Sequence, residues 1–114
     1  MPANGPEDMV WLVKLTHEAA AEAVICLDRA NPEALQAGLK EAASYNPPKI
    51  MINSLSGEQK RIDGVLPLAA EYKTELIVLA LDDKGIPETA EGRLEIVRRL
   101  VNMCREKGLS DEQL

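Results

Sequence analysis

Three polar residues, Asp28, Asn53 and Asp82, each come directly after a largely apolar run, and they lie 25 and 29 residues apart. An ionised carboxylate only accepts hydrogen bonds, whereas a carboxamide offers both donors and an acceptor. Asp28 and Asn53 together could therefore bind the amino-pyrimidinone edge of a flat heterocycle such as a pterin. The carboxylate would accept from a ring N–H and the exocyclic NH2 group. Asp and Asn also favour turns and helix caps, so a purely structural role for both residues stays open.

The runs before these residues show no polar alternation, which is typical of strands buried on both faces of a sheet. They span residues 23–27, 49–52 and 75–81. Helical spacing of apolar residues and capping residues predict helices over 6–20, 32–44 and 89–107, with one further turn at 110–113.

A third helix should follow a capping box formed by Ser56 and Gln59. Pro67 removes one hydrogen bond inside this helix, so we expect a kink near Asp63 or Gly64. Gly108 should end the last helix.

The order α-β-α-β-α-β-α requires parallel strands joined by right-handed crossovers. The fold class is therefore α/β, and residues 1–114 form one partial (β/α)8 barrel segment of about three βα units. Because the carboxyl ends of parallel strands meet at one edge, we expect Asp28 and Asn53 to converge at the barrel mouth. A free-standing doubly wound domain is the alternative, but the turn at 27–31 lacks its glycines.

Composition excludes several other classes of protein. The formal charge of −6 and the pI near 4.8 disfavour nucleic acid as a partner, and no run approaches the roughly 18 apolar residues of a membrane span. We expect a cytoplasmic protein with an aliphatic core, since only 3% of residues are aromatic. Cys26 and Cys104 should be reduced, packed thiols, and His17 a solvated side chain. We expect no metal site, although Asp82 and Asp83 could together hold magnesium.

Four segments of the chain resemble the methyltetrahydrofolate:corrinoid methyltransferases. They are residues 26–31 (CLDRAN), 49–54 (KIMINS), 82–87 (DDKGIP) and 108–114 (GLSDEQL). This family shares a pterin-binding (β/α)8 barrel with dihydropteroate synthase and moves a methyl group between N5 of tetrahydrofolate and the cobalt of a corrinoid protein. The resemblance implies that Asp28 and Asn53 contact the pterin ring and that Asp82 lies near the folate. It also implies a role in one-carbon metabolism, methyltetrahydrofolate as substrate and a partner protein that carries cobalamin.

The resemblance covers only strands three to five of that barrel. A further pterin-binding Asp and the Asn that hydrogen-bonds N5 belong to strands that the match does not include. We therefore expect an internal fragment with no catalytic residue of its own, inactive alone. Two alternatives are a dihydropteroate synthase-like enzyme, which normally has an acidic residue where Ser54 stands, and a non-catalytic half-barrel that forms homo-oligomers through its open sheet edges.

Overall fold

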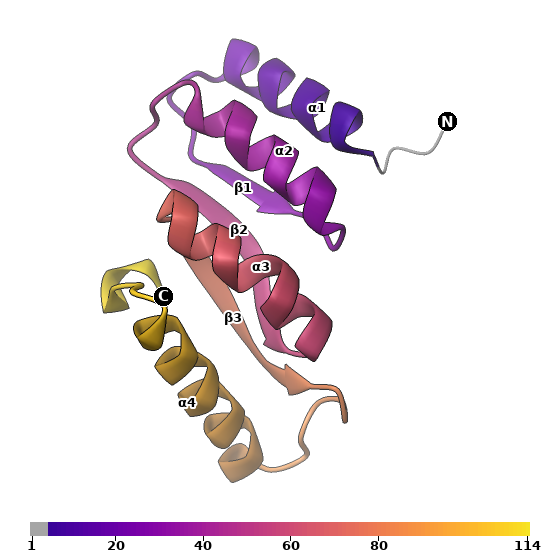
Figure 1. Cartoon of the computed structure of the whole chain (residues 1–114), viewed down its shortest axis with the longest axis vertical. Helices are drawn as coiled ribbons and strands as arrows, with labels where there is room; N and C mark the ends of the chain where they lie inside the picture. The colour runs from indigo at the N-terminus through magenta and orange to yellow at the C-terminus, as the bar shows by residue number, and fades with distance from the viewer. Residues whose placement is uncertain (1–4) are drawn as a thin grey trace.

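The computed structural model describes residues 5–114, and its helices and strands alternate along the chain (Figure 1). Their order confirms the predicted α-β-α-β-α-β-α pattern. The elements are α1 (Pro6–Ala19), β1 (Ile25–Asp28), α2 (Pro32–Ala43), β2 (Ile50–Gly57), α3 (Gln59–Tyr72), β3 (Glu75–Asp82), α4 (Ala90–Glu106) and a closing 3-10 turn (Asp111–Gln113).

The three strands form one parallel sheet in the order β1-β2-β3. Each strand is followed by a helix, which is the βα architecture of a partial (β/α)8 barrel. Local signals placed several boundaries correctly. The Asn31 side chain accepts from the amides of Glu33 and Ala34 at the start of α2, and Gly108 has a φ of 92° just after α4.

The second strand is longer than the sequence predicted, and this corrects two expectations. β2 continues to Gly57 because Leu55 and Gly57 pair with β3 and lie buried. Ser56 is therefore inside a strand, where its hydroxyl donates to Glu58 Oε1 at 2.8 Å, and α3 begins without a capping box. A capping box forms instead at the last turn, between Ser110 and Gln113.

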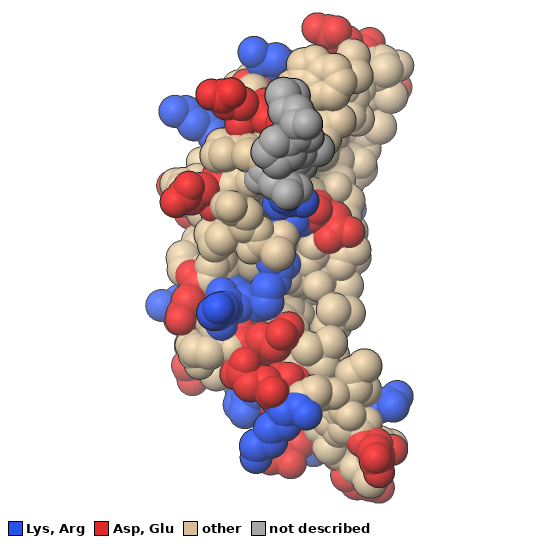
Figure 2. All heavy atoms as spheres, turned by 90° about the vertical axis from the view of Figure 1, so that its right-hand side faces the viewer, with Lys and Arg blue, Asp and Glu red and all other residues tan. Residues whose placement is uncertain are grey.

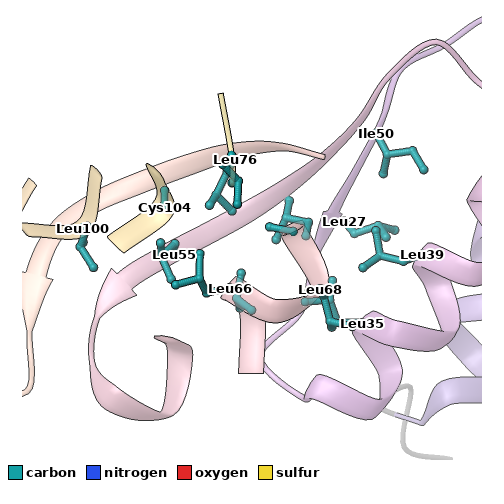
Figure 3. Close-up of a cluster of buried hydrophobic side chains, with 14 of the residues drawn as sticks. Leu27, Leu35, Leu39, Ile50, Leu55, Leu66, Leu68, Leu76, Leu100 and Cys104 are labelled. Atoms are coloured by element: carbon teal, nitrogen blue, oxygen red, sulfur yellow. The ribbon is translucent and has the colours of Figure 1, made fainter. Parts of the chain in front are cut away.

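The helices cover one face of the sheet, and this layer holds the core (Figures 1 and 3). The core is aliphatic, as expected, and its largest fully buried side chains include Leu35, Leu39, Ile52, Leu55 and Leu100. α1 packs against α2 and lies farther from the sheet. Gly38 permits this close approach, because a Cβ there would lie 2.5 Å from Met9 Cγ.

The other face of the sheet is open. Ile77 and Leu79 remain 36% and 39% exposed, although they are large apolar residues. The chain is correspondingly flat, with extents of 44 × 33 × 20 Å. Its accessible surface of 7314 Å² exceeds the roughly 6,200 Å² of a compact monomer of this mass. Figure 2 views the molecule from the side. Charged side chains gather over the helical side, and the opposite side, where the open face is seen in profile, is largely uncharged.

No helix within residues 5–114 is long and apolar enough to cross a lipid bilayer.

A stacked pair of rings joins α1 to the turn that follows α2. His17 and Tyr45 have ring centroids 3.7 Å apart and an interplanar angle of 8°, so His17 is half-buried and not the solvated side chain expected from sequence. The Tyr45 hydroxyl donates to Glu41 Oε2 at 2.6 Å. That hydrogen bond is the main cause that raises the pKa of Tyr45 to about 12.

We predict that Tyr45 ionises near pH 12, and that Glu41→Gln moves its pKa toward the usual 10. Because the pKa is raised in the folded state, the stabilisation is complete below pH 10 and is lost as the pH rises through about 12. Ultraviolet absorbance in a Tyr72→Phe background isolates the signal, and circular dichroism monitors folding. A titration that Glu41→Gln leaves unchanged would contradict the contact.

Candidate functional site

Asp28 and Asn53 are neighbours across the first two strands. They form the last pair in the register between β1 and β2. Paired residues of parallel strands project from the same face, and alternate residues project from opposite faces. Leu27 and Ile52, one residue earlier, are 3% and 0% exposed in the core beneath the helices. Asp28 and Asn53 therefore project from the open face, at the carboxyl end of β1.

Ile77 extends this row onto the third strand, because it pairs with Asn53 in the β2–β3 register. The row thus holds a carboxylate, a carboxamide and a partly exposed apolar side chain side by side. Such a row can accept and donate hydrogen bonds at one end and offer an apolar surface at the other. The β2–β3 register shifts directly after Asn53, so the regular sheet ends close to this row.

Cys26 and Met51 form another pair of the same ladder, two residues before Asp28 and Asn53. Cys26 is exposed on the open face and is not the packed thiol expected from sequence, whereas Cys104 is buried in the core. Partial burial, followed by the negative charge of Asp28, raises the pKa of the Cys26 thiol.

Asp82 is not brought together with Asp28 and Asn53. It ends β3 opposite Gly57, and alternation places it on the helical side with Leu76. Its carboxylate accepts from the Lys84 amide at 2.9 Å in a turn closed by backbone bonds between Asp82 and Gly85. It lines a cavity of about 280 Å³ that also includes residues of α3 and α4. These contacts show that Asp82 stabilises the turn that follows β3.

The two carboxylates of the acidic turn each accept a hydrogen bond from a backbone amide. The Asp83 carboxylate accepts from the backbone amide of Gln59 at 3.1 Å, and the Asp82 carboxylate accepts from the backbone amide of Lys84. Within residues 5–114, the structure brings together no group of three or more His, Cys, Asp or Glu side chains suited to hold a metal.

Sequence reasoning missed Arg61, which lies in the first turns of α3 and is half-buried. Its guanidinium donates to the backbone carbonyls of Arg29 and Ser54, the residues that follow Asp28 and Asn53. A basic residue after a strand is a weak signal, because its partners become visible only when β1 and β2 are placed side by side.

Parallel strands joined by helices on one face, with a carboxylate and a carboxamide paired beside the carboxyl end of a strand, define a partial α/β barrel. The chain belongs to the pterin binding enzyme family, whose pattern matches residues 1–113. This confirms the resemblance found in the sequence.

Individual relatives agree with this family. The chain is 29% identical over 110 residues to methylcorrinoid:tetrahydrofolate methyltransferase of Eubacterium limosum, which covers 95% of the chain and 39% of the relative. It is 31% identical over 83 residues to methionine synthase of Mycobacterium tuberculosis and 30% identical over 83 residues to that of Mycobacterium leprae. These two matches cover 68% of the chain and 7% of each relative. The chain thus spans well under half the length of these relatives.

We predict that Asp28→Asn speeds alkylation of Cys26 at a fixed pH near 8. Removing the negative charge lowers the pKa of Cys26 and increases the fraction of thiolate, which is the reactive form. Mass spectrometry after iodoacetamide treatment measures the rate, and buried Cys104 serves as an internal control that stays unmodified. An unchanged rate would show that Asp28 and Cys26 do not share the open face.

Proposed function

We propose that this chain supplies the pterin-ring contacts of a methyltransferase that moves a methyl group between N5 of methyltetrahydrofolate and the cobalt of a corrinoid protein. The observation that carries the proposal is the pairing of Asp28 with Asn53 on the open face. The family match and the names of the relatives support the choice of substrate class.

The row formed by Asp28, Asn53 and Ile77 suits one edge and one face of a pterin. The Asp28 carboxylate accepts from the ring N–H and the exocyclic NH2 group. The Asn53 carboxamide donates to and accepts from neighbouring ring atoms. Ile77 offers an apolar surface beside the ring. Asp82 lies on the helical side of the sheet, so we propose that it does not contact the ring.

The methyl group leaves a tertiary amine only when the amine nitrogen gains a proton or a strong hydrogen bond. The family resemblance assigns that contact with N5 to a strand beyond the three in this sheet. We therefore propose that the chain corresponds to strands three to five of the barrel and that it binds the ring but does not transfer the methyl group alone.

We assign the corrinoid to a partner protein. The chain's single histidine, His17, stacks on Tyr45 between α1 and α2, before the first strand begins, so no imidazole is placed beside Asp28 and Asn53 to ligate cobalt. The partner's cobalamin would supply the cobalt that exchanges the methyl group. A cytoplasmic location, in keeping with one-carbon metabolism, is part of the same proposal.

We predict that Asp28→Asn and Asn53→Ala each weaken methyltetrahydrofolate binding about tenfold. The first replaces a charged acceptor oxygen with an NH2 donor and the second removes the carboxamide, and each change costs about 1–2 kcal/mol. Calorimetry measures the affinity. Asp82→Asn makes the same chemical change outside the row and should leave the affinity unchanged. Equal losses in all three variants would contradict the assignment. Binding of a pterin pyrophosphate with aminobenzoate, and not of methyltetrahydrofolate, would favour the dihydropteroate synthase alternative.

We also predict no methyl transfer when the isolated chain is mixed with methyltetrahydrofolate and a reduced corrinoid protein. Losing one transition-state contact at N5 slows the reaction by about a hundredfold or more. The absorbance change of the corrinoid reports transfer. Sustained turnover would show that the described residues already contain the whole catalytic machinery.

A second candidate role is self-association, and the open sheet face favours it. This face exposes Ile77 and Leu79, and β1 and β3 each have a free edge within residues 5–114. The chain exposes about 1,000 Å² more than a compact monomer of its mass. A standard interface buries about 800 Å² on each partner, so the excess is large enough for one.

We predict a mass above the monomer's 12.5 kDa in light scattering at micromolar concentration. Leu79→Lys should shift the population to monomer, because it places a charge in the apolar face. Leu94→Lys is the matched control, since Leu94 is an exposed leucine on α4. A clean monomer in the unmodified chain would rule out this role.

A further inference from the structure

Arg61 connects the two strand segments that carry the proposed pterin contacts. Its Nη1 donates to the Arg29 carbonyl at 3.0 Å, and its Nε donates to the Ser54 carbonyl at 3.2 Å. Its Nη2 also donates to the Ser54 carbonyl. All three hydrogen bonds are partly buried and end on backbone carbonyls. The bond to Arg29 joins residues 32 positions apart in the sequence.

The position of these two carbonyls is specific. Arg29 directly follows Asp28, and Ser54 directly follows Asn53. The β1–β2 register ends at the Asp28–Asn53 pair, and β2 leaves regular register with β3 immediately afterwards. The pairing of β1 with β2 therefore stops at the two residues whose separation matters most, although β2 goes on pairing with β3. The next carbonyl on each strand is held by the Arg61 guanidinium in place of another rung of the sheet.

We propose that Arg61 is a positioning residue that fixes the spacing of Asp28 and Asn53 for the pterin ring. This inference rests on the proposed function of these two residues. A guanidinium is planar and presents its N–H groups in a rigid fork, so two carbonyls bound to it keep a set separation and orientation. A lysine ammonium at residue 61 keeps the charge but lacks this fork. The role therefore requires the shape of arginine and not its charge alone.

The chain offers a matched control in Arg93. This residue also donates its Nε to a backbone carbonyl, that of Pro87, at 2.9 Å. The Arg93 bond stabilises the segment between β3 and α4 and does not touch β1 or β2. Arg93→Met thus removes one arginine and its backbone bond while leaving the Asp28–Asn53 pair intact.

The test uses the whole chain, labelled with 13C and 15N, and compares Arg61→Met, Arg61→Lys and Arg93→Met. In the ligand-free chain, both Arg61 variants should shift the side-chain carboxyl signal of Asp28 and the side-chain amide signals of Asn53. Arg93→Met should leave these signals in place. Both Arg61 variants should also weaken methyltetrahydrofolate binding by about tenfold, with no rescue by lysine.

The outcomes separate the two proposals. If the Asp28 and Asn53 signals shift in the Arg61 variants but the unmodified chain does not bind methyltetrahydrofolate, the positioning role stands and the proposed function fails. If the unmodified chain binds and Arg61→Met or Arg61→Lys binds equally well, the positioning role is overturned. If the variants unfold, hydrogen exchange in the unmodified chain still tests the positioning role. The Arg61 Nε–H should exchange with solvent more slowly than the exposed Arg93 Nε–H, and equal exchange rates would refute this role.

Discussion

The parallel pairing of β1 with β2 is the constraint on which the site depends. Burial of Leu27 and Ile52 beneath the helices fixes which face of each strand enters the core. A slip of one residue in either strand would send an apolar side chain to the open face and a polar one into the core, at a cost of several kcal/mol. The packing energy of the helical layer therefore places Asp28 beside Asn53, without any direct bond between their side chains.

The same packing leaves the sheet covered on one side only. Within residues 5–114, helices cover one face, and the other face carries the candidate site together with exposed apolar residues. By the two roles proposed for it, a pterin ring and a second copy of the chain would both use this face, so ligand binding and self-association would compete. The hydrogen bonds of Arg61 lie where the pairing of β1 with β2 ends.

The sequence predicted the features that depend on local physics. The helix caps at Asn31 and Gly108, the apolar strands and their parallel order all follow from short-range rules that tertiary structure did not override. The misses depend on long-range contacts. β2 extends to Gly57 because β3 pairs with it, and His17 meets Tyr45 only when α1 packs against α2. The partners of Arg61 lie seven and 32 residues away, beyond any local pattern.

The most direct test of the account is a nuclear magnetic resonance titration of the 13C- and 15N-labelled chain with methyltetrahydrofolate. We expect the side-chain signals of Asp28 and Asn53 to shift together along one binding curve, accompanied by the methyl signals of Ile77, while the Asp82 carboxyl signal stays in place. Saturable shifts centred on Asp82 and α4, with Asp28 and Asn53 unmoved, would contradict it, because the ring would then lie on the helical side of the sheet.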